Sequence, residues 1–347
     1  MLRAVCLLAF GPAIYRAPAA QPEPTYRAVR VCATCHPAQA KPQPATSMAH
    51  ALETVPECGI LRSHALLTFH KGPYFYKIER QGDQSTYTVS DGTETLVVPI
   101  KYALGLGSAG QTYVFEKDGA LYESYVSFYR EINGLDVTLG DYNLRPTNLT
   151  EAAGRLLGER EITLCFGCHS TNSTIDAKFQ PQSLIPGVQC ERCHGDASQH
   201  LQSLRQGESK TFAMRDLRGM TAEDSTQFCG QCHRTWEQIA ANGPHGQANV
   251  RFQPYRLTNS KCFDADDKRI SCIACHDPHN EVDRVSTNYD AKCQACHAGG
   301  KPGAGACKVA TRNCASCHMP KVELVGGHHG FTDHEIRIVK ADQGYPD

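Results

Sequence analysis

Apolar and polar residues alternate most clearly in the stretch between residues 59 and 150. The alternating apolar positions are Tyr74, Tyr76, Ile78, Tyr87 and Val89. A period of two places such side chains on one face of a strand, and Asp91-Gly92 and Asp118-Gly119 are dipeptides typical of hairpin turns. We therefore expect a small antiparallel sheet or partly closed barrel in residues 59–150.

A glycine-rich stretch at residues 105–110 interrupts this pattern with the spacing of a dinucleotide-binding motif. Nucleotide binding requires a helix directly after the glycines, because the amides at its N-terminus hold the pyrophosphate. Here residues 111–115 read as a further strand instead. We interpret the stretch as a turn and reject nucleotide binding.

The chain beyond residue 150 has little apolar content for a conventional core. Short segments rich in Gly, Pro, Asn and Asp join densely spaced cysteines between Cys165 and His334. We expect short α-helices and irregular loops in residues 151–347, wrapped around bound groups that supply the missing apolar surface.

The N-terminus has the three regions of a secretory signal. Met-Leu-Arg is followed by an apolar run from Ala4 to Ile14 and then by Ala17-Pro18-Ala19. The run is too short to span a bilayer, and no stretch of 18 apolar residues follows it. We expect residues 1–19 to be a signal peptide, with export to the periplasm, cell surface or extracellular space and no transmembrane anchor. A buried first helix is the alternative.

The composition is unusual in pairing 18 Cys with 16 His in 347 residues. Disulfide scaffolds need cysteine but have no reason to match it with histidine, so metal or haem ligation is the first hypothesis. A formal net charge of -1 and the lack of a dense basic patch argue against nucleic acid as a partner.

Seven stretches have the form Cys-x-x-Cys-His, where chance would give about 0.04 matches. They are Cys32/Cys35/His36, Cys165/Cys168/His169, Cys190/Cys193/His194, Cys229/Cys232/His233, Cys272/Cys275/His276, Cys293/Cys296/His297 and Cys314/Cys317/His318. We number them motifs 1 to 7 in this order. On one helical turn, positions i, i+3 and i+4 project to the same side, so two thiols can bond the porphyrin vinyl groups while the histidine binds iron. The sequence therefore predicts seven covalently bound haems c, with the motif histidines as proximal ligands. Stacked haems would supply the apolar surface around which the short helices and loops wrap.

Zinc is the main alternative for paired cysteines. A zinc site does not require a histidine after every second cysteine, and seven units cannot pair evenly. The same repetition argues against a thioredoxin-like redox pair. Cys58, Cys262 and Cys307 remain without an assignment, and Cys6 lies in the expected signal peptide.

Nine further histidines can supply distal ligands to seven irons. They are His50, His64, His70, His200, His245, His279, His328, His329 and His334. This supply favours haems with two histidine ligands and no open position. Methionine is the alternative for one site, and it would raise that haem's potential. The methionines beyond the signal are Met48, Met214, Met220 and Met319.

These motifs resemble the multihaem cytochrome c superfamily that includes cytochrome c-554, hydroxylamine oxidoreductase and multihaem nitrite reductases. The resemblance rests on Ser-Met-Ala-His at 47–50, Cys-Glu-Arg-Cys-His-Gly at 190–195, Cys-His-Asp-Pro-His at 275–279, Cys-His-Met-Pro at 317–320 and Phe-Thr-Asp-His at 331–334. It implies that His50, His200, His279 and His334 are distal ligands to haems other than that of the adjacent motif. It also implies redox chemistry in the cell envelope.

The chain departs from the enzymes of this superfamily in two respects. No Cys-x-x-Cys-Lys motif is present, as the nitrite reductases have, and there is one motif fewer than in the octahaem hydroxylamine oxidoreductases. We therefore expect electron transfer between redox proteins or quinol-linked donors in the cell envelope, without a catalytic residue. A reductase or oxidase of a small nitrogen or sulfur compound is the alternative, and a subunit of an oligomer or filament is a third.

The expected organisation has four parts. A signal peptide spans 1–19, a first haem segment 20–58, a β-rich haem-free insert 59–150, and a hexahaem cytochrome region 151–347.

Overall fold

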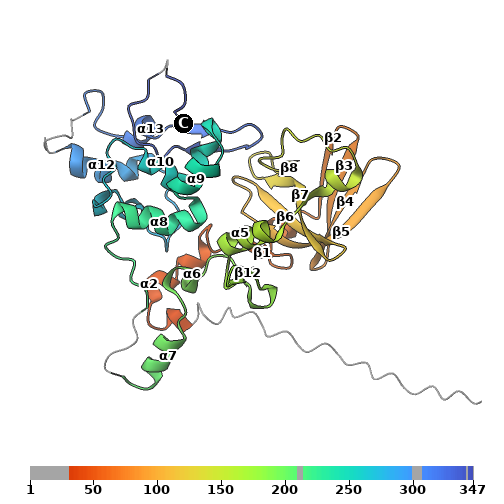
Figure 1. Cartoon of the computed structure of the whole chain (residues 1–347), viewed down its shortest axis with the longest axis horizontal. Coiled ribbons are helices and arrows are strands. Elements are labelled where there is room, and N and C mark those ends of the chain that lie inside the picture. The colour runs from red at the N-terminus through yellow and green to blue at the C-terminus, as the bar shows by residue number, and fades with distance from the viewer. Residues whose placement is uncertain (1–30, 209–213, 299–306, 341–342, 347) are drawn as a thin grey trace, which may run out of the picture.

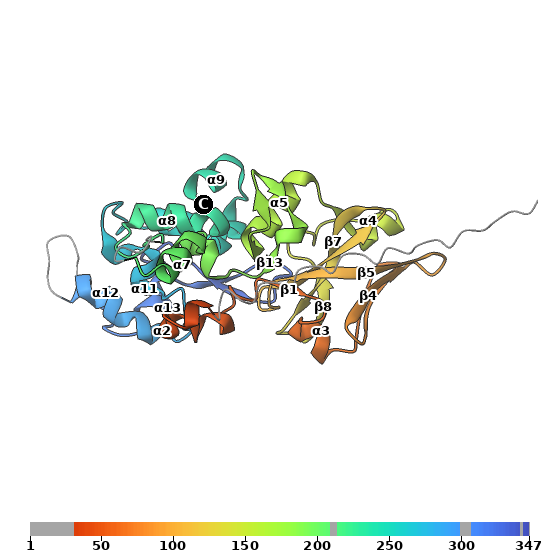
Figure 2. The same cartoon turned by 90° about the horizontal axis from the view of Figure 1, so that it is seen from below.

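The protein has two lobes, one made of strands and the other of short helices and loops (Figure 1). The computed structural model describes residues 31–208, 214–298, 307–340 and 343–346. The expected signal peptide therefore lies outside the described residues. A view turned by 90° shows the same separation of the two lobes (Figure 2).

The β lobe is one antiparallel sheet of nine strands. Its strands are β1 (Leu52–Thr54), β2 (Leu66–Lys71), β3 (Tyr74–Gln81), β4 (Gln84–Ser90), β5 (Thr95–Leu104), β6 (Gln111–Lys117), β7 (Ala120–Tyr129), β8 (Gly134–Val137) and β9 (Gly154–Leu156). Strands β2 to β8 pair in chain order, while β1 pairs with β5 and β9 pairs with β7. The end strands β2 and β8 contact each other without pairing, so the sheet forms a partly closed barrel.

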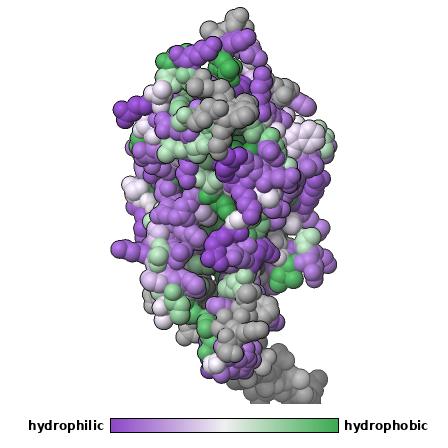
Figure 3. All heavy atoms as spheres, turned by 90° about the vertical axis from the view of Figure 1, so that its left-hand side faces the viewer, coloured by the Kyte–Doolittle hydropathy of each residue, from purple (hydrophilic) through white to green (hydrophobic). Residues whose placement is uncertain are grey.

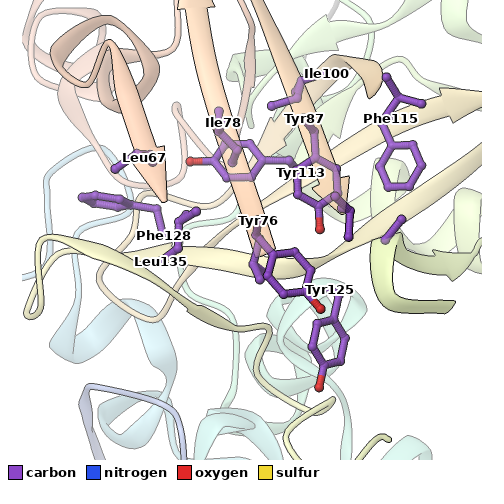
Figure 4. Close-up of a cluster of buried hydrophobic side chains, with 14 of the residues drawn as sticks. Leu67, Tyr76, Ile78, Tyr87, Ile100, Tyr113, Phe115, Tyr125, Phe128 and Leu135 are labelled. Carbon is purple, nitrogen blue, oxygen red and sulfur yellow. The ribbon is translucent and has the colours of Figure 1, made fainter. Parts of the chain in front are cut away.

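The alternating apolar positions form the core of this barrel. Tyr76, Tyr87 and Val89 are fully buried, and the ring of Tyr76 stacks on those of Tyr87 and Tyr125 with centroids 6.5 and 5.9 Å apart (Figure 4). Because a period of two sends these side chains to one face, the pattern predicted the strands correctly.

The sheet is larger than the sequence indicated. It has nine strands and extends beyond residues 59–150 on both sides, through β1 and β9. Each of these two strands is three residues long, and three residues are too few to show an alternating pattern. They join the sheet only because β5 and β7 offer backbone groups for pairing.

The glycine-rich stretch is a turn between β5 and β6. Gly105, Gly107 and Gly110 have φ values of +87°, +78° and +105°, which suit glycine. The amide of Gly107 donates to the carbonyl oxygen of Gly110 at 3.2 Å, and β6 begins at the next residue. Since no helix follows, the interpretation as a turn is confirmed.

The second lobe contains short helices joined by loops. The α-helices of the chain are α2 (Pro37–Ala40), α3 (Gly59–Ser63), α4 (Leu149–Ala153), α5 (Glu159–His169), α6 (Cys190–His194), α7 (Ser198–Arg205), α8 (Ala222–His233), α9 (Trp236–Asn242), α10 (Gln253–Thr258), α11 (Cys272–Cys275), α12 (Asp290–His297) and α13 (Cys314–His318). The short strands are β10 (Ser170–Thr171), β11 (Thr174–Ile175), β12 (Lys178–Phe179), β13 (Ile185–Pro186), β14 (Lys321–Glu323) and β15 (Gly330–Thr332). Within the described ranges, no helix is both long and apolar enough to cross a membrane.

Candidate haem sites

All seven Cys-x-x-Cys-His motifs lie on a single turn of helix. Motifs 2, 4 and 6 are the last turns of helices α5, α8 and α12. Motifs 3 and 7 are the whole of α6 and α13, and α11 runs from the first to the second cysteine of motif 5. In motif 1 the amide of His36 donates to the carbonyl oxygen of Cys32 at 2.8 Å, which closes one helical turn. Each motif therefore places two thiols and one imidazole on the same side, as covalent haem attachment requires.

Three motif histidines are oriented by a backbone carbonyl. The Nδ1 atoms of His169, His194 and His318 lie 2.8, 3.0 and 2.8 Å from the carbonyl oxygens of Ala51, Arg215 and Arg337. Since Nδ1 carries the proton in such a bond, the lone pair is on Nε2. This is the arrangement of metal-ligating histidines, whose second nitrogen donates to a fixed acceptor.

Burial favours the neutral form of several motif histidines. Desolvation lowers the pKa of His169, His233 and His276 from its usual value. A neutral imidazole is the form that binds a metal, so these side chains are suited to hold haem iron.

Two motif histidines face histidines from elsewhere in the chain. The ring centroids of His194 and His279 are 6.1 Å apart, and those of His276 and His334 are 6.2 Å apart. Bonds of about 2.0 Å from a metal to each Nε2, plus roughly 1 Å from each nitrogen to its ring centre, give a centroid separation of about 6 Å. Both pairs therefore fit one iron between two imidazoles.

In each pair, the histidine from outside the motif also has a hydrogen-bond partner at Nδ1. The Nδ1 of His279 lies 3.1 Å from a carboxylate oxygen of Asp277, and that of His334 lies 3.0 Å from the carbonyl oxygen of Thr332. Burial, the largest effect, lowers the pKa of His334 to about 4. A proton on Nδ1 leaves the lone pair of each imidazole on Nε2, the nitrogen that can bind a metal.

A buried ion pair lies beside His334. The guanidinium of Arg256 donates through Nε to Oδ1 of Asp333 at 2.9 Å and through Nη2 to Oδ2 at 3.1 Å, and both side chains are fully buried. Arg256 also binds Glu335 and lies 4.7 Å from the ring centre of Tyr345. Because Arg256 binds both Asp333 and Glu335, this network holds the backbone on both sides of His334. No pattern in the sequence indicated this network.

Other distal candidates have different surroundings. His50 has its Nδ1 3.0 Å from Glu53 and lines a cleft of about 600 Å³ together with Arg130, Glu281 and Arg284. His329 packs edge-on against Phe331, whereas His200 lies in α7 and His245 directly precedes a turn of 3-10 helix.

Three further candidates lie in the β lobe or against it. Both ring nitrogens of His64 have partners, Nε2 of His328 lies 2.7 Å from a carboxylate oxygen of Asp136, and His70 is exposed on β2. The sequence could not show this, because the partners Asn133 and Asp136 belong to the β lobe.

Several attachment cysteines of different motifs lie against one another. The thiols in hydrogen-bonding contact are Cys32 with Cys190, Cys168 with Cys232, Cys229 with Cys272, and Cys293 with Cys314. Because each thiol marks one edge of a haem site, motifs 1 and 3, 2 and 4, 4 and 5, and 6 and 7 are neighbours.

Six attachment cysteines are outside these pairs: Cys35, Cys165, Cys193, Cys275, Cys296 and Cys317. The thiol of Cys35 is exposed, and that of Cys296 is half-buried near Cys262 and Arg269. For all six, attachment to haem stays a prediction from the spacing of the motifs.

The cysteines outside the motifs have other surroundings. The buried thiol of Cys58 donates to Gln111 at 3.2 Å, while Cys262 and Cys307 are exposed. No two cysteines in the described ranges form a disulfide. No cluster of three or more His, Cys, Asp or Glu side chains suited to a metal ion occurs among the described residues, so the structure offers no zinc site there.

A glycine sets the distance between the first haem segment and motif 3. Gly187 has a φ of +70°, and a Cβ atom there would lie 1.7 Å from the carbonyl oxygen of Ala49. We expect Gly187→Ala to destabilise the protein by about 2 kcal/mol or more, because the two backbones must separate. Denaturant unfolding of the haem-loaded protein measures this, with the unobstructed Gly59→Ala as the control.

Comparison with known proteins identifies similar multihaem cytochromes. The family model described as "Cytochrome c554 and c-prime" matches residues 145–195, which contain motifs 2 and 3. The "Multiheme cytochrome MtrA" of Shewanella baltica (strain OS185) is 24% identical over 187 residues, covering 50% of this chain and 47% of the relative. The chain thus spans about half the length of this curated relative.

A solved structure is also similar. The "Crystal Structure of Outer Cell Wall Cytochrome OcwA" aligns with a TM-score of 0.48 and 15% identity, covering 89% of this chain and 79% of that chain. The predicted resemblance to multihaem cytochromes c is confirmed by the family and relative matches.

Proposed function

We propose that this multihaem cytochrome c carries seven haems c and transfers electrons between redox partners through them. The observation that carries this proposal is the pair of imidazole couples, His194 with His279 and His276 with His334, at 6.1 and 6.2 Å. When bound, each haem supplies reversible one-electron redox chemistry. Two histidines per iron leave no position for a substrate, which suits a carrier.

The chain's own residues prepare these sites before any electron moves. The backbone carbonyls of Ala51, Arg215 and Arg337 hold three motif imidazoles in one orientation. A ligand that is fixed in advance does not need to reorganise when the charge of its metal changes. His334 is half-buried, and burial is one of the factors that set a haem potential.

The contacts between attachment thiols join the motifs in three groups: 2 with 4 and 5, 1 with 3, and 6 with 7. Arg192 of motif 3 lies 3.7 Å from the thiol of Cys232 in motif 4, and the Tyr289 hydroxyl, next to the helix of motif 6, lies 3.5 Å from Nδ1 of His276 in motif 5. These contacts support a path for electrons through all three groups, with the short helices of the second lobe wrapped around its stacked haems. Residues 20–58 and 151–347 are then the haem-carrying segments, and residues 59–150 are haem-free.

We place this protein outside the cytoplasm, in the periplasm or at the cell surface, after cleavage of a signal peptide at residues 1–19. Its partners would be redox proteins or quinol-linked donors of the cell envelope. The end of the helical lobe is mainly hydrophilic with small apolar patches (Figure 3). Such a surface suits brief docking, since transient redox encounters use small and largely polar interfaces.

The test is spectroscopy of the exported, haem-loaded protein. We expect seven haems per chain by pyridine haemochrome assay. His279→Ala and His334→Ala are each expected to convert one haem from low spin to high spin in electron paramagnetic resonance, because each removes one axial ligand. An unchanged spectrum in both variants would contradict the pairing, and fewer haems in the parent protein would contradict the stoichiometry.

A further inference from the structure

Three half-buried arginines gather around motif 4, and the proposed ligation uses none of them. Arg192 lies within motif 3, Arg234 directly follows His233 of motif 4, and Arg251 ends the 3-10 helix Gly246–Arg251. Within the described ranges, none of the three forms an ion pair with a carboxylate. Their positive charges are therefore not neutralised by neighbouring acidic side chains.

Arg192 connects three motifs through one guanidinium. Its Nε donates at 3.1 Å to the carbonyl oxygen of Gly167, which lies between the two cysteines of motif 2. Its Nη2 lies 3.7 Å from the thiol of Cys232 in motif 4. Because a guanidinium is planar and its donors point in fixed directions, these two contacts hold the charge in one place.

Arg234 and Arg251 bring two further charges to the same region. The charge of Arg234 acts on Cys168 of motif 2 and on Cys232 of motif 4, as the charge of Arg192 does. Arg234 also acts on Arg251, whose buried Nε has no hydrogen-bond partner among the residues that the structure describes. Since like charges repel, negative charge that a bound cofactor brings to this region is favourable.

Most other motifs have carboxylates in their surroundings. A carboxylate acts on attachment thiols of motifs 1, 3, 6 and 7, and it belongs to Glu191 for the first two and to Asp290 for the last two. Glu123 acts on motif 2, while one cation, Lys292, acts on motif 5. Because every haem brings the same two propionates, the charges of the chain set these sites apart.

We propose that motif 4 carries the haem of highest reduction potential, so that the first electron taken up by the chain rests there. On reduction, ferric iron gains one electron to become ferrous, and its site loses one positive charge. A fixed cation nearby stabilises the reduced form, whereas a carboxylate stabilises the oxidised form. This inference rests on the proposed haem loading and adds to it the place where electrons gather.

A spectroelectrochemical titration of the haem-loaded protein tests this proposal. In the parent protein, the first component to be reduced should account for about one seventh of the α-band absorbance. The double variant Cys229→Ala and Cys232→Ala should lack this component. The matched variant Cys314→Ala and Cys317→Ala should keep it and lose a later one. Persistence of the first component without motif 4 contradicts the proposal.

Substitutions of Arg192 and Arg234 test the electrostatic cause. Arg192→Gln and Arg234→Gln should each lower the equilibrium share of the first electron on motif 4 by about tenfold, because each removes one charge from a half-buried position. Arg192→Lys and Arg234→Lys keep the charge and should restore most of this share. Arg218→Gln, which changes an exposed arginine paired with Asp216, should leave it unchanged. If the lysine variants lose as much as the glutamine variants, the arginines only position the motifs and the proposal is overturned.

The haem count separates this proposal from the proposed function. A pyridine haemochrome assay gives the number of haems in the parent protein and in each variant. Fewer than seven haems in the parent protein contradict the proposed function. Seven haems in a parent protein whose first-reduced component survives the loss of motif 4 contradict only the order of potentials.

Discussion

Replacing Asp333 by Ala is expected to lower the free energy of unfolding by about 3 kcal/mol or more, because it leaves a buried guanidinium without its main partner. Arg256 and Asp333 are both fully buried and share two hydrogen bonds, at 2.9 and 3.1 Å. Glu335 remains beside Arg256, but Arg337 loses its carboxylate partner at the same time. The effect should appear in denaturant unfolding of the haem-loaded protein.

The same substitution is expected to release the neighbouring His334 from its place opposite His276. The Asp333 amide donates to the carbonyl oxygen of Pro320 and its carboxylate accepts from the amide of Glu335, so this residue sets the local backbone. A mixed-spin or high-spin signal from one haem would show the displacement, and added imidazole should restore low spin. A merely destabilised protein would lose stability without this spectral change.

Two control variants separate these effects. Glu116→Gln breaks the exposed pair with Lys101 and should change stability by less than about 1 kcal/mol. Asp136→Ala removes the contact of His328 with β8 but keeps Arg256 and Asp333 together. If Asp136→Ala opens the same haem as Asp333→Ala, the ion pair has no specific positioning role.

Removing both attachment thiols of motif 4, with Cys229→Ala and Cys232→Ala, is expected to interrupt electron transfer as well as to remove one haem. These two thiols contact Cys272 of motif 5 and Cys168 of motif 2. Without a haem at this junction, the electron must cross a gap as wide as one haem site. Intramolecular electron transfer after a laser flash should then slow by orders of magnitude for part of the haems.

The matched control removes motif 7 with Cys314→Ala and Cys317→Ala. This motif contacts motif 6 through Cys293 and lies at the end of the series in the chain. Its loss should lower the haem count by one while the remaining haems exchange electrons at the parent rate. Equal slowing in both double variants would show that motif 4 is not a junction.

The sequence predicted the β lobe because its signal is local. Alternation at Tyr76, Tyr87 and Val89 sets the buried face, and these residues are the core of the barrel. The pattern could not predict β1 or β9, because each has three residues and joins the sheet only by pairing with distant strands. The size of the sheet was therefore underestimated.

The sequence by itself determined the haem-binding chemistry. Two thiols and an imidazole at positions i, i+3 and i+4 share one side of a helical turn, whatever the rest of the chain does. Seven such motifs therefore predict seven attachment sites without any knowledge of the fold. For the six attachment cysteines outside the thiol pairs, this spacing remains the whole argument. The resemblance to multihaem cytochromes follows from the same motifs, and the comparisons support it.

Only the tertiary structure decided which histidines face one another. Arg256 and Asp333 are 77 positions apart, and His328 and Asp136 are 192 positions apart, so no local pattern relates them. A histidine becomes a ligand or a structural residue according to which groups surround its Nε2. That depends on how the two lobes and the C-terminal segment pack, and packing brings together residues that the sequence keeps apart.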